Sequence, residues 1–283
     1  MNITGQTKLL ALIGDPVIQA RTPALMNQLL YAQDLQADYT LIPMQISRAH
    51  LSEVVNSLRC VQNFSGAVIT MPHKVAICAL LDTLTPEAKA IGAVNVIYRD
   101  TLGRLHGHIL DGEGFVSGLL AAGHQVQGCH CIMRGAGGAS AAIAFALARH
   151  GCASLRIYNR TVQTAENLKD QLYAIYPDFN VTVGDCQEFL AEIATQEKNM
   201  LAEDVFDIAI NASSLGMNAH DSLPFPAEKI KRCKLVAECV IAPEQTAFLQ
   251  LGKSLGIQTH SGINMLNSQL ALMLQFMTKK TAE

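Results

Sequence analysis

The stretch Cys131-Ile-Met-Arg-Gly-Ala-Gly-Gly-Ala-Ser-Ala-Ala-Ile-Ala-Phe-Ala-Leu-Ala148 decides the fold class, because it reads as a strand, a glycine-rich turn and an alanine-rich helix. Gly135 permits the tight turn, and Gly137 lets the backbone approach a pyrophosphate. The small residues that follow leave the amide groups of the helix N-terminus open to phosphate. We therefore predict a dinucleotide site here, although a plain tight turn also accounts for the glycines.

The next strand strengthens this interpretation. Ser154-Leu-Arg-Ile-Tyr158 is apolar enough for a buried strand, and Asn159-Arg160-Thr161 follows it. The end of this strand is where a Rossmann domain contacts the adenosine ribose, roughly 20 residues past the glycines. No acid stands there, and an arginine suits a 2′-phosphate better than a free hydroxyl, so the motif favours NADP(H). The alternative is that Arg160 is a solvated residue at a strand end.

Composition limits the classes of protein. A chain of 283 residues exceeds a typical single domain, so two domains are expected. Its 49% hydrophobic and 16% charged residues are typical of a globular protein. The net charge of −3, with no basic cluster, argues against nucleic-acid binding. Because no apolar run has transmembrane length and the N-terminal segment does not resemble a signal peptide, we expect no membrane partner and a cytoplasmic protein.

The cysteines and histidines indicate no metal. Eight cysteines are scattered along the chain, and Cys129 and Cys131 are separated by one residue instead of the two of a CxxC pair. Reduced, mostly buried thiols are therefore expected. His73 and His108 have no spacing that marks a ligand pair, and no carboxylate cluster accompanies them, so we expect no metal site.

Strands and helices alternate outward from the glycine-rich segment, which predicts an α/β fold with parallel sheet. Thr22-Pro23 fits an N-cap followed by proline in the first turn. Before the glycines we expect strands at 8–13, 39–44, 66–70 and a pair at 94–98 and 104–108, with helices from 23, over 47–58, from 85 to about 92, and from 112. After them we expect helices at 162–173, 186–194, 245–255 and 264–277, and strands at 179–183, 206–211 and 234–239.

Two polar residues could take part in catalysis. Lys74 follows a strand and a proline-containing turn, where a lysine is usually a solvated charge. Asp111 precedes a helix, where an ordinary N-cap explains it about as well as catalysis. The residues taken singly indicate only an NADP-binding α/β protein.

The order of motifs goes further, because the chain closely resembles the shikimate dehydrogenase family along nearly its whole length. The motifs that carry the resemblance are Ile13-Gly-Asp-Pro16, Arg21-Thr-Pro23, Thr70-Met-Pro-His-Lys74, Gly92-Ala-Val-Asn95, Gly107 to Gly112, Gly135-Ala-Gly-Gly-Ala-Ser140, Asn159-Arg-Thr161, Ile210-Asn-Ala-Ser-Ser-Leu-Gly-Met217, and Gly262 with Met265-Leu-Asn-Ser-Gln269.

The resemblance implies two domains: an N-terminal α/β substrate domain and a Rossmann-type dinucleotide-binding domain. It assigns 1–106 to substrate binding and catalysis and 107–241 to NADP binding, with the C-terminal helices of 242–283 packing on the substrate domain. The implied cofactor is NADP, with NAD possible. The implied partner is a small cyclic hydroxy acid, bound by a monomer or homodimer.

The resemblance also implies roles for individual residues. Lys74 is the expected acid/base and Asp111 its catalytic partner, because hydride transfer leaves an alkoxide-like oxygen that needs a proton donor. The expected substrate-binding residues are Thr22, Thr70, Asn95 and Gln269. The expected cofactor-binding residues are Gly135, Ala136, Gly137, Gly138, Ala139, Ser140, Asn159, Arg160 and Thr161, with Ala212, Ser213 and Gly262 near the nicotinamide.

Several positions depart from the family pattern and make the expected pocket more apolar. The Ser-x-Ser pair of the first loop is Ala20 and Thr22 here, and threonine at the second position favours a quinate-like substrate. Val68 replaces an asparagine, and Ile109-Leu110 replaces Asn-Thr before the aspartate. Ile241 replaces a tyrosine. The true substrate therefore stays open among cyclic hydroxy acids.

Two further departures concern the nucleotide domain. The acid that precedes position 241 is Glu238 where the family has aspartate. A second arginine that often helps to hold the 2′-phosphate is Thr164, which weakens the expected preference for NADP over NAD.

Two classes of function follow. The first is an NADP-dependent oxidoreductase acting reversibly on shikimate, quinate or a related ring. The alternative is a nucleotide-binding regulatory protein or a low-activity paralogue. Lys74, Asp111, Asn95 and Gln269 favour the enzyme. A folate dehydrogenase or glutamyl-tRNA reductase leaves the Thr70–Lys74 and Gly262–Gln269 motifs unexplained.

Overall fold

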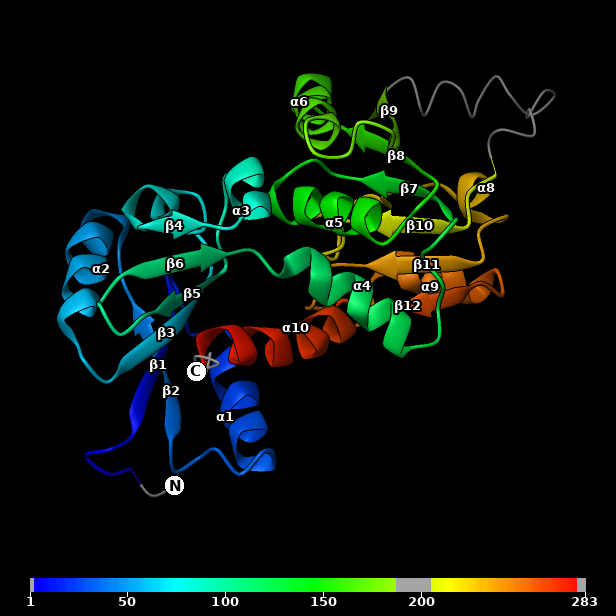
Figure 1. Cartoon of the computed structure of the whole chain (residues 1–283). Coiled ribbons are helices and arrows are strands. Elements are labelled where there is room, and N and C mark those ends of the chain that lie inside the picture. Colours follow the sequence, from blue (N-terminus) through cyan, green and yellow to red (C-terminus); the bar gives the residue numbers. More distant parts are fainter. Residues whose placement is uncertain (1–2, 187–204, 279–283) are drawn as a thin grey trace. The chain divides into compact units, whose positions relative to one another are not determined.

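The computed structural model describes residues 3–186 and 205–278 (Figure 1). The chain forms two compact units: Met1–Leu110 with Gln269–Glu283, called the first unit here, and Asp111–Ser268, called the second unit. The sequence places the boundaries after 106 and 241 instead. The second boundary differs most, because the residues from 242 to 268 belong to the second unit.

The first unit is built around a six-stranded sheet with the order β2-β1-β3-β5-β6-β4. β1, β2 and β3 run parallel, and β5 is antiparallel to both β3 and β6. Its elements are β1 (Lys8–Gly14), α1 (Thr22–Ala32), β2 (Tyr39–Gln45), the 3₁₀ turn η1 (Arg48–His50), α2 (Leu51–Cys60), β3 (Phe64–Ile69), η2 (Ala76–Leu80), β4 (Thr83–Leu84), α3 (Pro86–Ile91), β5 (Val96–Arg99) and β6 (Leu105–His108).

Burial explains the centre of this sheet. All six residues of β3 are buried, and β1 is buried from Leu10 onward, as expected for parallel strands covered on both faces. The last turns of α10 (Gly262–Met277) also belong to this unit. Ser65 donates a hydrogen bond to the Met277 carbonyl at 2.7 Å, which fixes the end of that helix beside β3.

Local details of the first unit differ from the predictions. α1 begins at Thr22, so Arg21 is its N-cap and no side chain caps the helix; Thr22 is the first helical residue. The segment predicted as one helix over 47–58 begins with a 3₁₀ turn before α2. The predicted hairpin of β5 and β6 is confirmed, but it makes the sheet mixed rather than parallel.

The second unit contains a fully parallel six-stranded sheet with the order β12-β11-β10-β7-β8-β9 (Figure 1). This order reverses direction at β7, as in a doubly wound dinucleotide-binding fold, so the predicted Rossmann-type class is confirmed. Its elements are α4 (Asp111–Ala121), β7 (His130–Arg134), α5 (Gly138–Arg149), β8 (Ser154–Asn159), α6 (Val162–Tyr173), β9 (Asn180–Asp185), β10 (Ile208–Asn211), α8 (Ala227–Ile230), β11 (Leu235–Glu238), α9 (Ala247–Ser254) and β12 (Gln258–His260).

The end of the second unit explains why residues 242–268 stay with it. α9 packs on β11 and β12, and β12 adds a strand that the sequence does not predict. The prediction that the helix at 245–255 falls outside the nucleotide unit is therefore wrong. The helix predicted over 186–194 lies, after Cys186, outside the described residues.

Close helix packing anchors the start of the unit. α4 lies against α5, and a side chain on Gly112 would overlap the Ala142 backbone. Only glycine allows this approach.

Among the described residues, no helix combines the length and apolar character needed to cross a membrane.

Candidate active site

The glycine turn after β7 is fixed to both neighbouring strands of the second unit. The amide of Gly135 donates to the Tyr158 carbonyl of β8 at 2.8 Å, and the amide of Ala212 donates to the Arg134 carbonyl at 2.9 Å. Gly135 has φ +117°, a conformation that glycine adopts without strain. The Ser140 hydroxyl donates to the Ala212 carbonyl at 2.8 Å, so predicted cofactor residues from two loops are brought together.

The N-terminus of α5 has the open space that a phosphate requires. Gly137 is the N-cap and Gly138 the first helical residue; both are exposed, and no atom lies within 4 Å of the place a Cβ would occupy on either. Ala136 is buried and Ala139 half-buried, so the turn is small on its inner side too. The first amides of a helix lack intrahelical partners and attract anions. These residues therefore fit the pyrophosphate of a dinucleotide.

The end of β8 presents a cation beside the same edge. The Asn159 side chain donates to the Thr161 carbonyl at 2.9 Å, which fixes the turn into α6. Arg160 and Thr161 are exposed. Thr164, in the first turn of α6, is also exposed. An exposed guanidinium at a strand end is well suited to a phosphate ligand.

The loop after β10 is shaped by Asn211, a residue to which its sequence motif alone gives no role. Asn211 is fully buried; its oxygen accepts hydrogen bonds from the Ser213 hydroxyl at 2.7 Å and amide at 3.2 Å. Its nitrogen donates to the Leu215 carbonyl at 2.7 Å and to Glu238. The signal in the sequence is a polar residue that ends each of two apolar strands, Ile208-Ala-Ile-Asn211 and Leu235-Val-Ala-Glu238.

Electrostatics around β11 favour neutral thiols. Burial raises the pKa of Cys239 well above its usual range, and the carboxylates of Glu238 and Asp111 act in the same direction. Asp111 is the first residue of α4 and is 4% exposed.

Gly262 is the first residue of α10, where an added side chain would overlap the Val240 carbonyl. The second unit thus holds Asp111 and Gly262 in tightly packed backbone.

In the first unit, the loop from Thr70 to Lys74 is tied to the ends of β1 and β2. The Thr70 amide donates to the Ile13 carbonyl at 2.9 Å and the His73 amide to the Thr70 carbonyl at 3.0 Å. The buried His73 places Nε2 at 2.6 Å from the Ile46 carbonyl, so this nitrogen carries the proton. These bonds hold the loop that carries the half-buried Lys74.

Asn95 lies beside this loop. The Val94 amide donates to the Lys74 carbonyl at 2.8 Å, and the Ile69 amide donates to the Asn95 carbonyl at 2.8 Å. The Asn95 side chain is 1% exposed and accepts a hydrogen bond from the Leu110 amide at 2.9 Å. Backbone contacts therefore bring Thr70, Lys74 and Asn95 onto adjacent loops, and Asn95 fixes the residue just before Asp111.

The other predicted substrate residues are placed separately. Thr22 is half-buried at the start of α1, and Gln269, 4% exposed, lies on α10. His108 bonds the Thr85 hydroxyl at 2.8 Å. Within residues 3–186 and 205–278, no three His, Cys, Asp or Glu side chains gather as a metal site.

The apolar replacements are largely buried. Val68, Ile109 and Leu110 are 4–6% exposed, whereas Ala20 and Ile241 are half-buried. Each of these side chains is apolar and offers no hydrogen-bonding group at a position where the family resemblance leads us to expect one.

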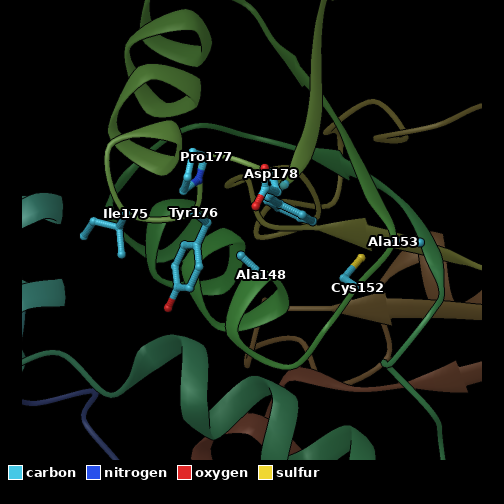
Figure 2. A pocket seen from close by; sticks show the side chains of 8 residues that line it. Ala148, Cys152, Ala153, Ile175, Tyr176, Pro177 and Asp178 are labelled. Carbon is cyan, nitrogen blue, oxygen red and sulfur yellow. The ribbon is translucent and has the colours of Figure 1, made fainter.

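A cavity of about 350 Å³ in the second unit lies away from the glycine turn. Its lining comes from the segments that precede β8 and β9, at the amino ends of those strands, and Figure 2 shows Tyr176 and Cys152 among them. The residues are Ala148, Cys152, Ala153, Ile175, Tyr176, Pro177, Asp178 and Phe179. Ligands of doubly wound sheets bind at the carboxyl ends of strands, so this cavity is not part of the candidate site.

Comparison with known proteins agrees with the motifs. A family model described as the shikimate dehydrogenase substrate binding domain matches residues 12–97. A shikimate dehydrogenase (NADP(+)) from Rubrobacter xylanophilus is 36% identical over 269 residues, covering 93% of this chain and 88% of that protein.

Solved structures extend the likeness to the fold. Shikimate 5-dehydrogenase from Listeria monocytogenes, in complex with shikimate and NAD, has a TM-score of 0.86 and 30% identity, covering 99% of this chain and 94% of that one. Quinate dehydrogenase from Corynebacterium glutamicum, in complex with NAD, has a TM-score of 0.82 and 28% identity, covering 98% and 95%. From the identity over nearly its whole length, this chain belongs to the shikimate dehydrogenase family.

Proposed function

We propose that this chain is an NADP-dependent dehydrogenase that transfers hydride reversibly between NADP(H) and a cyclic hydroxy acid such as shikimate or quinate. The observation that carries the proposal is the open, glycine-lined N-terminus of α5 next to the exposed Arg160. Relatives named for NADP and shikimate, and a structural neighbour named for quinate, support the substrate class.

The dinucleotide is held by the second unit in this proposal. The amides at Gly137 and Gly138 face the pyrophosphate, Arg160 pairs with the 2′-phosphate, and Asn159 and Thr161 shape the ribose end. Ala212, Ser213 and Gly262 border the nicotinamide. When bound, the nicotinamide supplies the hydride acceptor or donor, which no side chain can provide. NAD is a weaker alternative, because its ribose has a free 2′-hydroxyl and no phosphate with which Arg160 could form an ion pair.

Lys74 and Asp111 supply the proton transfer. Oxidation of a carbinol removes a proton from its oxygen, and reduction returns one, so a group able to change charge must lie within hydrogen-bond reach. Lys74 takes that role in the proposal, with Asp111 as its catalytic partner. Thr22, Thr70, Asn95 and Gln269 bind the hydroxyls and carboxylate. We propose that the enzyme acts in the cytoplasm, as a monomer or homodimer, on this small molecule.

A substrate and cofactor screen tests the proposal. Formation of NADPH and of NADH should be followed with shikimate, quinate and less hydroxylated ring carboxylates. The proposal expects turnover with at least one of them and a preference for NADP⁺. Binding of NADP⁺ without turnover of any ring substrate would instead favour the regulatory reading and contradict the enzyme.

A further inference from the structure

A buried carboxylate at the end of β11 gathers hydrogen bonds from three parts of the second unit. Glu238 has no exposed surface. Its Oε1 accepts from the side-chain nitrogen of Asn211 and from the amides of Cys239 and Val240, each at 2.9 Å. Its Oε2 accepts from Asn211 at 3.0 Å and from the Thr246 hydroxyl at 3.0 Å. All these partners are neutral donors, which matches an ionised carboxylate that can only accept.

Each partner leads to a different segment around the expected nicotinamide end. The Asn211 side chain also bonds the Ser213 hydroxyl and the Leu215 carbonyl. It therefore connects Glu238 to the loop that carries Ala212 and Ser213. Thr246 is the N-cap of α9, where its side chain also accepts from the Leu249 amide at 3.3 Å. Removal of the carboxylate would therefore release two loops and one helix start together.

The start of α10 rests on the same backbone. A Cβ on Gly262 would overlap the Val240 carbonyl and approach Cys239 within 2.8 Å. The amides of Cys239 and Val240 are the two that Glu238 holds. Gly262 thus packs directly on the turn fixed by the carboxylate, and a shift of that turn moves the surface that Gly262 contacts.

The charge of Glu238 is supported by its donors and opposed by its surroundings. Burial raises its pKa, while hydrogen bonds from Val240, Asn211, Thr246 and Cys239 act in the opposite direction. A buried carboxylate is costly unless its oxygens are satisfied, so losing donors or charge here should loosen the local structure.

We propose that Glu238 is a positioning residue for the nicotinamide half of the cofactor. It holds the loop after β10, the 239–240 turn and the N-terminus of α9 in register, and thereby aligns Ala212, Ser213 and Gly262. The adenosine half depends on Arg160 and on the turn that follows β8. In the described part of the chain, the Asn159 side chain holds this turn through the Thr161 carbonyl and not through Glu238, Asn211 or Thr246. The inference rests on the proposed function.

Binding of cofactor fragments separates this role from a purely structural one. Glu238→Gln keeps the shape but introduces an amide that cannot accept at both positions. Dissociation constants for NADPH and for 2′,5′-ADP, which lacks the nicotinamide half, are measured by calorimetry. The fluorescence of bound NADPH reports the surroundings of its nicotinamide ring, and turnover is measured alongside.

The expected result is selective. Glu238→Gln should lower turnover by at least about tenfold, since small misplacements of reacting groups have such effects. Bound NADPH should fluoresce more like free NADPH, and the affinity for 2′,5′-ADP should stay within about twofold. Glu238→Asp, which keeps the charge, should recover part of the turnover. If Glu238→Gln does not fold, Thr246→Val removes one of the bonds and should give a smaller change of the same kind.

A matched control removes stability as an explanation. Ile230→Val trims a fully buried side chain in the same core and should leave fluorescence and turnover unchanged. Equal loss of NADPH and 2′,5′-ADP affinity in the Glu238 variants, or unaltered NADPH fluorescence and turnover, would overturn the positioning role. If the unmodified protein binds no NADPH, the proposed function itself fails, and the two results are distinguishable.

Discussion

Arg160 is the side chain on which the choice between NADP and NAD depends. It is exposed at the end of β8, and Thr164 supplies no second cation. One charge-assisted contact contributes about 1.5–3 kcal/mol, so we expect NADP⁺ to bind roughly 10- to 100-fold more tightly than NAD⁺. Arg160→Ala should abolish this difference by weakening NADP⁺ alone, measured by titration calorimetry with both nucleotides.

An exposed arginine elsewhere in the second unit provides the control. Arg232→Ala changes the net charge equally and should leave both affinities unchanged. Thr164→Arg should add a contact and increase the preference for NADP⁺. Equal affinities of the unmodified protein for the two nucleotides would contradict the role given to Arg160.

His260 makes stability depend on pH. It is 1% exposed, and its Nε2 has no hydrogen-bond partner within residues 3–186 and 205–278. Burial, followed by the neighbouring His124, lowers its pKa from 6.5 to about 4. Between these values the unfolded chain binds a proton that the folded protein does not, so stability falls as the pH falls. From about pH 7 to about pH 5 the loss attributable to His260 is about 2 kcal/mol.

Chemical denaturation at both pH values measures this loss. His260→Gln cannot titrate, so the difference in unfolding free energy between the two pH values should shrink by about 2 kcal/mol relative to the unmodified chain. The same substitution at the exposed His220 should preserve the full difference. An unaltered difference in His260→Gln would show that this histidine is not the group responsible.

At the scale of elements, the turn from β7 into α5 distinguishes a structural glycine from a ligand-facing one. A side chain on Gly135 meets both a φ of +117° and the Ala212 carbonyl at 2.7 Å. Gly135→Ala should therefore lower the unfolding free energy by about 1–3 kcal/mol. Gly137→Ala meets open space, so it should fold normally but weaken NADP⁺ at least about tenfold, or about 1.4 kcal/mol.

Thermal denaturation and NADP⁺ titration on both variants check this contrast. Gly137→Ala should unfold like the unmodified protein, so a loss of NADP⁺ affinity in this variant would not come from unfolding. Gly135→Ala is the matched variant in which the unfolding free energy should fall. Unweakened NADP⁺ binding in Gly137→Ala would mean that the pyrophosphate does not approach α5 at this position.

The same elements show what the sequence could predict. β7, α5 and β8 have apolar strands, a glycine turn and an alanine-rich helix in continuous order, so their local signals agree with the fold. β12 has only three residues and no apolar run, and it forms because β11 offers an edge for pairing. α9 belongs to the second unit because it packs on β11 and β12. The local sequence pattern does not reveal β12, so it could not predict this placement.

The candidate site divides in the same way. Lys74, Asn95 and the residues of the glycine turn stand in contiguous motifs, so the family resemblance identifies them directly. The Asn211–Glu238 network joins residues 211, 238 and 246, which are far apart in sequence. A sequence shows polar residues at strand ends but not which of them share a hydrogen bond, so this part of the site required the structure.

At the scale of the whole molecule, we expect the departures from the family pattern to lower activity on shikimate. Ala20, Val68 and Ile241 each stand where the family has a polar group. Loss of a hydrogen bond to a charged group costs about 1.5–3 kcal/mol and to a neutral one about 0.5–1.5 kcal/mol, so kcat/KM for shikimate should be roughly 10²- to 10⁴-fold below that of a typical member.

Restoring the polar groups tests this expectation. Ala20→Ser combined with Ile241→Tyr should raise kcat/KM for shikimate, measured by steady-state NADPH formation. A kcat/KM for shikimate in the unmodified protein as high as in typical members would contradict it, because the pocket would then have recovered the lost contacts elsewhere.

Turnover of Lys74→Ala is the measurement that tests the enzyme assignment most directly. We predict a decrease of about 10²-fold or more with the best substrate from the screen, since proton transfer contributes about that much. NADP⁺ affinity should be unchanged, because the nucleotide residues belong to the second unit. Lys89→Ala, which removes an exposed lysine of α3, should retain full turnover. Undiminished turnover in Lys74→Ala would show that Lys74 does not transfer the proton.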